Sequence, residues 1–203
     1  MTIIIYNVKA NREKMMRVSR EQVTENRRAI LEAAGRLFRE RGYDAVTVAE
    51  VMRASGLTHG GFYGYFRSKD ELIAHALAAA LTRATGPSGD LEAYAAGYLS
   101  RAHRDDLAGG CSTAALAAET IRQTGGARAE MTVGLKRQIE RLSRVSPGKN
   151  GAEKRRAAIG VWAAMVGAMV LARVSDDAAL SDELLDQTRA WLAARNKPAW
   201  ARG

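Results

Sequence analysis

The stretch TVAEVMRASGLTHGGFYGYF, residues 47–66, decides how this chain folds. Its first four residues have the form of a capping box, in which the hydroxyl of Thr47 and the carboxylate of Glu50 satisfy the free amides at a helix start. The short helix that begins there is ended by Gly56, which can adopt the positive φ of a tight turn. A second short helix follows, which the Thr58 side chain can cap, so the segment is predicted to be a helix-turn-helix.

The second of these helices has an unusual composition. Each glycine in a helix interior costs about 1 kcal/mol relative to alanine, yet Gly60 and Gly61 stand side by side. Phe62 and Phe66 are four residues apart and are expected to face the core together. A flexible loop with aromatic anchors is the alternative interpretation. The capping boxes and the basic surroundings favour a surface that another large molecule, DNA, approaches closely.

Helical patterns continue on both sides of this stretch. Apolar residues recur at helical spacing from Thr24 to Arg41, and Gly42 is well placed to end that helix. On the other side, SKDE at residues 68–71 is a second possible capping box, and the helix after it has a continuous apolar face. Residues 21–70 are therefore predicted to form a DNA-binding domain, and residues 71–203 a second, all-helical domain.

Residues 1–20 are rich in basic side chains and are predicted to be a disordered arm. Met15 and Met16 offer later translation starts, so the first fifteen residues could be absent from the cell. A basic arm that lies along a phosphate backbone is the alternative interpretation.

The composition limits the classes of function. The net charge of +9 suggests an anionic partner. The single cysteine, Cys111, cannot form a disulfide framework or a four-cysteine metal site within one chain, which favours a cytoplasmic location. The longest apolar run, residues 157–172, is shorter than the ~20 residues of a membrane span and predicts a helix buried on all sides. No membrane partner, cofactor or metal is expected.

Catalysis is not expected either. The sequence has no H-E-x-x-H and no G-x-S-x-G pattern. The stretch GGCSTAA, residues 109–115, lacks the preceding strand of a nucleophile elbow, and Ser112 is better interpreted as a helix cap. In the C-terminal part of the chain, further helices are predicted near residues 90–107, 112–124, 127–145, 151–174 and 181–195. The predicted fold class is therefore all-α.

Residues 27–77 resemble the DNA-binding domain of TetR-type transcriptional regulators. The pattern includes Gly42, Thr47 and Gly56, then the aromatic cluster of residues 62–66 and Ser68–Lys69. The resemblance implies a homodimer whose N-terminal three helices bind a palindromic DNA operator. It also implies a C-terminal domain with a small-molecule pocket, whose occupation releases the DNA.

The resemblance also assigns roles by position. It implies phosphate contacts from Arg27, Thr47, Thr58, Tyr63 and Lys69. It implies base-facing positions at His59, Gly60 and Gly61. The chain departs from the family pattern at Gly61, Gly64 and Arg67, which leaves the base contacts undetermined because glycine has no side-chain donor.

The C-terminal half contains two further sets of candidate residues. Small and apolar residues at helical spacing are candidates for a dimer interface, and the alternative is an ordinary core within one chain: Gly160, Ala164, Gly167, Ala168, Leu171, Leu184 and Trp191. Aromatic and polar residues are candidates for the lining of a pocket, each of which could equally be a core or surface residue: Tyr94, Tyr98, His103, Cys111, Met131 and Trp162.

Together these patterns predict a ligand-responsive, sequence-specific transcriptional regulator, most simply a repressor released from its operator by a small molecule. The alternative is a DNA-binding protein without an effector, such as a constitutive regulator or an architectural binder. A closed cavity in the C-terminal domain would favour the first hypothesis.

Overall fold

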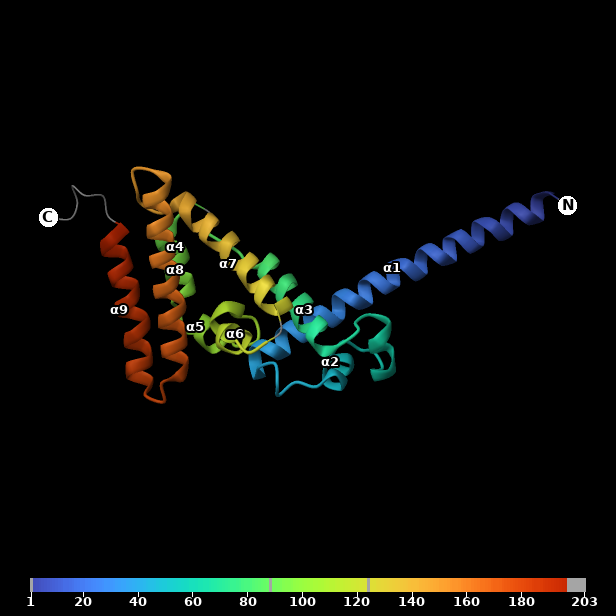
Figure 1. Cartoon of the computed structure of the whole chain (residues 1–203), viewed down its shortest axis with the longest axis horizontal. Helices are drawn as coiled ribbons and strands as arrows, with labels where there is room; N and C mark the ends of the chain where they lie inside the picture. Colours follow the sequence, from blue (N-terminus) through green and yellow to red (C-terminus); the bar gives the residue numbers. More distant parts are fainter. Residues whose placement is uncertain (1, 88, 124, 197–203) are drawn as a thin grey trace.

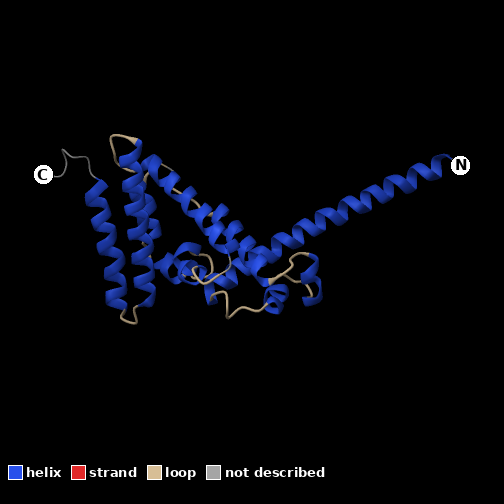
Figure 2. Cartoon of the chain, viewed as in Figure 1, coloured by secondary structure: helices blue, strands red, loops and turns tan. Residues whose placement is uncertain are grey.

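A computed structural model of the chain describes residues 2–87, 89–123 and 125–196, and within them the side chains of residues 20–195. This part of the chain consists of helices and loops and has no strand, so the predicted all-α class is confirmed (Figure 2). The elements in chain order are α1 (Thr2–Arg41), α2 (Val48–Ala54), the 3-10 helix η1 (His59–Gly64), α3 (Lys69–Arg83), α4 (Leu91–Tyr98), α5 (Arg101–Asp105), α6 (Ser112–Thr120), α7 (Gly125–Val145), α8 (Gly151–Val174) and α9 (Ala178–Asn196).

The elements form an elongated molecule (Figure 1). The helices α1, α2 and η1 lie at one end, and α8 and α9 form an antiparallel pair at the other. Between them α3 and α7 run alongside each other, and α5 and α6 fill the space below. The N-terminal part of α1 projects away from the rest of the molecule.

Two hydrophobic cores hold this arrangement. The first joins α1, α2, η1 and α3, with Phe38, Tyr43, Phe62 and Phe66 among its fully buried side chains. Leu116 of α6 and residues of α7 also belong to it. The second core joins α4, α7, α8 and α9. Because α6 and α7 contribute to both cores, a movement in the second core has a packed route to the first.

The first helix is longer than predicted. A helix start was expected near Thr24 with a disordered arm before it, whereas α1 begins at Thr2. No proline occurs between residues 2 and 41, so nothing in the sequence breaks the helix before Gly42. Gly42 ends it as predicted, with φ +81° and its N–H donated to Phe38 O at 2.8 Å. The side chains of residues 1–19 lie outside the described residues, and with them most basic side chains of the alternative interpretation, an arm along a phosphate backbone.

Two other expectations differ from the structure. The helix predicted at residues 90–107 is divided into α4 and α5, because Ser100 caps α5 by accepting from His103 N at 3.2 Å. The predicted domain boundary after residue 70 falls at the start of α3, whose inner face packs into the first core. The division of the chain at that residue therefore stays a proposal.

Candidate nucleic-acid interface and ligand cavity

The capping box at the start of α2 is confirmed in full. The Thr47 hydroxyl accepts from Glu50 N at 3.2 Å, and Glu50 Oε2 accepts from Thr47 N at 2.8 Å. Arg41 Nη2 donates to the other carboxylate oxygen of Glu50 at 2.7 Å. The Thr47 amide, and then Arg41, lower the pKa of Glu50 to about 2. This network fixes α2 against the end of α1. It also occupies the Thr47 hydroxyl, so a phosphate would have to compete with Glu50 for a hydrogen bond to that hydroxyl.

The turn and the element after it differ in part from the prediction. Gly56 has φ +77°, as a tight turn requires. The element that follows, η1, is a six-residue 3-10 helix rather than an α-helix. Thr58 precedes it but makes no side-chain capping bond, so its predicted capping role is wrong. Two adjacent glycines weaken the preference for an α-helix, and a short 3-10 turn is the conformation that remains.

Aromatic side chains fix η1 to the first core. Phe62 and Phe66 are 1% and 2% exposed, which confirms the prediction that they face inward. Their rings stack with centroids 5.8 Å apart. Tyr63 points the other way and is 74% exposed. The Tyr65 hydroxyl accepts from Asn26 Nδ2 at 2.9 Å, which ties this segment to α1.

The folded chain does not itself require the glycines of η1. An added Cβ would have no atom within 4 Å at Gly60 or Gly64, and would make ordinary contacts at 3.8 Å at Gly61. None of the three is among the glycines with positive φ. The fold therefore gives no reason for glycine at these positions, and a close approach by another molecule would give one.

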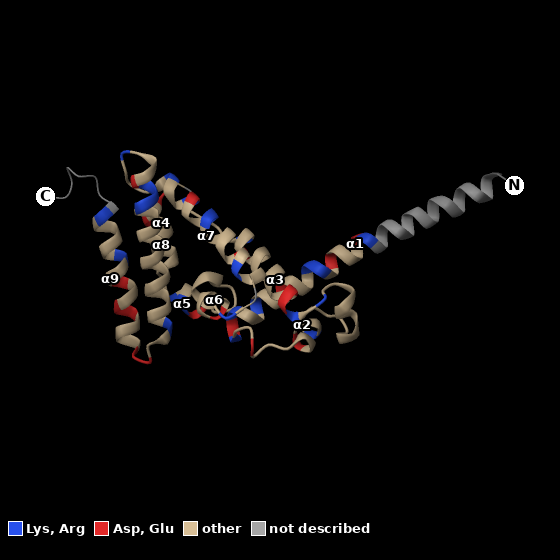
Figure 3. Cartoon of the chain, viewed as in Figure 1, with Lys and Arg blue, Asp and Glu red and all other residues tan. Residues whose placement is uncertain are grey.

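Positive charge flanks η1 but is absent from it (Figure 3). Arg53 and Arg67 are exposed on either side, and Lys69 begins α3. The Arg27 guanidinium lies over the Phe66 ring, 5.0 Å from its centroid, so this cation is held beside η1. Arg27 and Lys69, two of the predicted contact residues, thus lie near η1, while their contacts with DNA stay predictions.

A cavity of about 790 Å³ lies between the two cores. Its wall contains Tyr94, Tyr98, His103, Cys111 and Trp162, which come from four separate elements and loops and which were candidates for a pocket. Met131 was also a candidate, but it is 6% exposed in the first core and is not part of the wall. It lies on the inner side of α7, where its sulfur contacts Thr113 Oγ1 at 4.0 Å.

Sequence patterns did not identify the charged part of the cavity wall. Arg39 of α1, Arg83 of α3 and Arg141 of α7 all line the cavity, together with Gln138 and Asp106. These residues are far apart in the sequence, and each fits the polar face of an ordinary helix. No local signal therefore marks them as members of one site.

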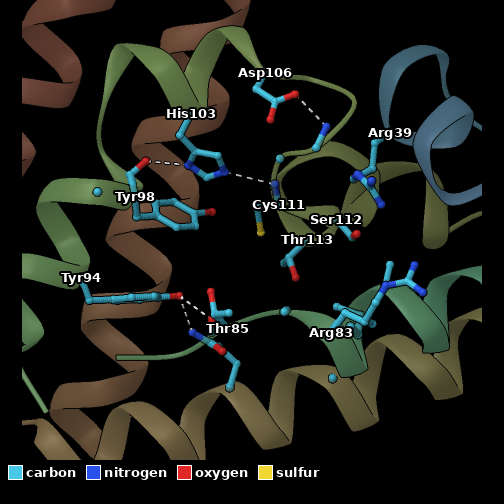
Figure 4. Close-up of a pocket in the computed structure, with 18 of the residues that line it drawn as sticks. Arg39, Arg83, Thr85, Tyr94, Tyr98, His103, Asp106, Cys111, Ser112 and Thr113 are labelled. Carbon is cyan, nitrogen blue, oxygen red and sulfur yellow. Dashed lines mark hydrogen bonds between the residues drawn. The ribbon is translucent and has the colours of Figure 1, made fainter. Parts of the chain in front are cut away.

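One side of the cavity is held by a chain of hydrogen bonds. Arg141 Nη2 donates to Gln138 Oε1 at 2.6 Å, and Gln138 Nε2 donates to the Tyr94 hydroxyl at 2.8 Å. Tyr94 in turn donates to Thr85 O at 3.4 Å (Figure 4). Burial raises the pKa of Tyr94 to about 12. The Tyr94 ring is therefore oriented before any ligand binds.

His103 is half-buried and uses both ring nitrogens. Its Nε2 accepts from Cys111 N at 3.1 Å, so its Nδ1 must carry the proton that is donated to Tyr98 O at 2.7 Å. The imidazole is thus neutral in this arrangement. It joins α5 to the start of α6 across the cavity wall (Figure 4).

The cavity is connected to the helix-turn-helix through α6. The first residues of α6, Ser112 and Thr113, line the cavity. At its other end, Glu119 Oε2 accepts from Tyr43 N at 2.6 Å, and Thr120 Oγ1 lies 3.1 Å from the Tyr43 hydroxyl. Tyr43 is fully buried in the turn between α1 and α2. A displacement of α6 would therefore act directly on the helix-turn-helix.

A second exposed surface lies on α8 and α9. Of the described helices, α8 is long and apolar enough to cross a membrane, by length and composition alone. Only 33% of its most apolar 18-residue stretch is buried, so the expectation of a helix buried on all sides is wrong. Its exposed stripe includes Ile159, Gly160 and Leu171, and Trp191 of α9 is 49% exposed.

The predicted dimer residues divide between this stripe and the chain's own core. Gly160, Leu171 and Trp191 are exposed, and Ala164, Gly167 and Leu184 are partly buried. Ala168 is 5% exposed and packs in the second core, so the structure does not leave it free for a partner. The reason is helical geometry, because Ala168 lies on the inward face with the buried Met165 and Ala172.

Comparison with known proteins identifies the N-terminal part of the chain. Residues 30–76 match the sequence profile of a family described as bacterial regulatory proteins, tetR family. The chain is 41% identical over 59 residues to the HTH-type transcriptional repressor Rv1474c of Mycobacterium tuberculosis, a match of 29% of this chain and 32% of that protein. It is 39% identical over 59 residues to the HTH-type transcriptional regulator TtgR of Pseudomonas putida, over 29% and 28% of the two chains. The alignments thus span about a third of the length of these relatives.

The similarity of fold extends over most of the chain. The structure of Escherichia coli NemR in its reduced form matches 86% of this chain and 98% of its own, with a TM-score of 0.70 and 24% identity. A TetR-family regulator from Agrobacterium tumefaciens matches 83% and 98%, with a TM-score of 0.65 and 20% identity. Residues 30–76 thus match the tetR family of bacterial regulatory proteins, and the fold of most of the chain is similar to that of the solved TetR-family regulator.

Proposed function

We propose that this protein is a homodimeric transcriptional repressor, which a small molecule releases from a palindromic DNA operator. The observation that carries the proposal is the position of the cavity. Arg39 and Arg83, which lie on the helices α1 and α3 of the first core, form part of its wall. A ligand in this cavity would contact the helices that position η1.

DNA binding is assigned to the exposed surface of η1 and its surroundings. His59, Gly60 and Gly61 would face the base edges of the major groove, where the absence of side chains lets the backbone approach closely. The cations and hydroxyls around them would contact phosphates and fix the orientation of the domain: Arg27, Thr47, Thr58, Tyr63 and Lys69. The sequence specificity would then come from few direct contacts and from the shape of the groove.

Dimerisation is assigned to the exposed stripe of α8 and α9. A second copy of the chain would cover the apolar side chains of Ile159, Leu171 and Trp191, with Gly160 at a point where two helices can approach closely. Two η1 elements related by the two-fold axis would occupy half-sites about one turn of DNA apart, roughly 34–36 Å.

Regulation would follow from the contacts of α6. A ligand that displaces the start of α6 or the end of α3 would pull on Tyr43, which Glu119 and Thr120 hold at the other end of α6. The distance between the two η1 elements of the dimer would change, and the operator would be released. This release requires that the ligand bind the displaced arrangement of the dimer more tightly than the operator-binding arrangement.

The proposal is tested by capture of genomic DNA fragments with the purified protein at fixed salt, followed by sequencing. Enrichment of one or a few palindromic sites is expected. Uniform, salt-sensitive capture would instead support an architectural binder. An effector that weakens operator binding without any change in the spacing of the two η1 elements would refute the proposed coupling.

A further inference from the structure

The cavity has two chemically different ends. Tyr94 and Tyr98 lie on one side of it, and Arg39 and Arg83 lie on the opposite side (Figure 4). Its volume of about 790 Å³ is in the range that holds a drug-sized molecule. A ligand that fills it would therefore meet aromatic rings at one end and guanidinium groups at the other.

The cationic end carries more positive than negative charge. Arg39 is half-buried, and its pKa is lowered first by burial and then by the neighbouring Arg83. Its Nε donates to the main-chain Ala108 O at 2.7 Å. Among the described residues it forms no ion pair within 4.0 Å, and Asp106 is the nearby carboxylate that partly offsets its charge. Arg83 has one carboxylate neighbour, Glu32, at 3.6 Å.

The remaining charges of the wall do not remove this excess. Arg141 also lines the cavity and donates to Gln138 rather than to a carboxylate. Asp106 is the acidic residue of the wall, and its Oδ1 accepts from Gly109 N at 2.8 Å. His103 is neutral because its Nε2 accepts a hydrogen bond. The wall thus has three guanidinium groups and one carboxylate, and for the half-buried Arg39 the partial removal of the cation from water is unfavourable.

The aromatic end has hydrogen-bond donors without partners. Tyr98 and Trp162 are each 8% exposed, with ring centroids 5.4 Å apart. The Tyr98 hydroxyl and the Trp162 Nε1 are buried, and neither has a hydrogen-bond partner among the described residues. Burial raises the pKa of Tyr98, and the adjacent Cys111 raises it further. Buried donors of this kind normally have acceptors. Because both atoms have almost no accessible surface, a ligand in the cavity would reach them only after these side chains shift.

From these two ends we infer that the cavity binds an organic anion with an aromatic body, of which an aromatic carboxylate is the simplest form. The carboxylate binds at Arg39 and Arg83, where guanidinium groups can donate paired hydrogen bonds. The ring lies against Tyr94, Tyr98 and Trp162. The inference rests on the proposed function, since it names the chemical class of the effector of that regulator.

Anion binding at this place would also act on the DNA-binding helices. Arg39 stands near the end of α1, and Arg83 is the last residue of α3. A carboxylate between them replaces the repulsion of two like charges by attraction to a common anion. Arg39 would also weaken its hydrogen bond to Ala108 O in favour of one to the carboxylate. That bond joins α1 to the loop before α6.

The test uses direct binding to the full-length protein, measured by titration calorimetry. The probes are benzoate, 2-naphthoate and anthracene-9-carboxylate, each beside its neutral primary amide. At least one acid is expected to bind about 10- to 100-fold more tightly than its amide, the range of charge-assisted hydrogen bonds. Arg39→Gln and Arg83→Gln should remove the preference. Arg36→Gln is the matched control, since Arg36 is exposed one turn before Arg39 and does not line this cavity.

Equal binding of acids and amides would overturn the inference, as would a preference for acids that survives in both arginine variants. Failure of all three acids to bind at millimolar concentration would also overturn it. The comparison of acids with amides in the unmodified protein stands even if a variant does not fold. DNA takes no part in this titration, so its result is distinct from that of the capture experiment, which tests the proposed function.

Discussion

The glycines of η1 lead to a prediction in which stability and DNA binding change in opposite directions. Replacement of Gly60 by alanine adds a methyl group where no atom lies within 4 Å and where φ is not positive. A Gly→Ala change at such a position stabilises a protein by about 0.4–1 kcal/mol, because it restricts the unfolded chain. For a chain of this length the thermal midpoint should rise by about 1–4 °C.

The same methyl group should weaken DNA binding. If the backbone at Gly60 touches the floor or wall of the major groove, the added atom must displace part of a packed interface, at roughly 1–3 kcal/mol. This corresponds to a loss of about 5- to 150-fold in affinity for each protomer contact. The expected result of Gly60→Ala is therefore a more stable protein that binds its operator less well.

The measurement combines thermal unfolding with titration of a captured operator by fluorescence anisotropy. Gly151→Ala is the control, because Gly151 also has open space around it but begins α8, far from η1. It should stabilise the protein and leave DNA affinity unchanged. Gly56→Ala should destabilise it, since φ is +77° there. An unchanged operator affinity in Gly60→Ala would refute the argument that DNA requires this glycine.

Three further predictions concern other parts of the molecule. Because Glu50 has a pKa of about 2 in the folded chain against an ordinary value of 4.5, its ionised form stabilises the fold above pH 4.5 and loses that effect as the pH falls towards 2. The gap in thermal midpoint between the parent and Glu50→Gln should close over that pH range, and a constant gap would contradict the capping argument. Tyr43→Phe removes the hydrogen bond to Thr120 and should lower the free energy of unfolding by about 0.5–1.5 kcal/mol in chemical denaturation, with no change expected if that bond is unimportant. Leu171→Glu places a charge in the proposed dimer interface and should give monomers in sedimentation. These monomers should stay folded, because Leu171 is 52% exposed in the single chain. A persistent dimer would exclude this face as the interface.

The helix-turn-helix was predictable because its signals are local. A capping box requires only Thr47 and Glu50 three residues apart, and a turn requires only a residue such as Gly56 that tolerates positive φ. The inward direction of Phe62 and Phe66 follows from their spacing on one element. Each of these features depends on neighbours along the chain, so one sequence is enough to recognise it.

Some local expectations failed where two tendencies competed. The element after the turn is a 3-10 helix without a Thr58 cap, because adjacent glycines weaken an α-helix that the pattern otherwise favours. The helix expected through residue 100 is interrupted because the Ser100 hydroxyl caps a new helix. The start of α1 was misplaced because nothing before Thr24 opposes the helix, although the composition resembles that of a disordered arm.

The sequence by itself determined the all-α class, the helix-turn-helix and the aromatic candidates for the cavity. Only the tertiary structure brought Arg39, Arg83 and Arg141 into one wall, removed Met131 from it and buried Ala168 in the chain's own core. It also joined Tyr43 to Thr120, which are 77 residues apart. The physical reason is that capping, turns and periodicity are set by residues a few positions apart, whereas the charge and shape of a cavity depend on which distant helix faces pack together.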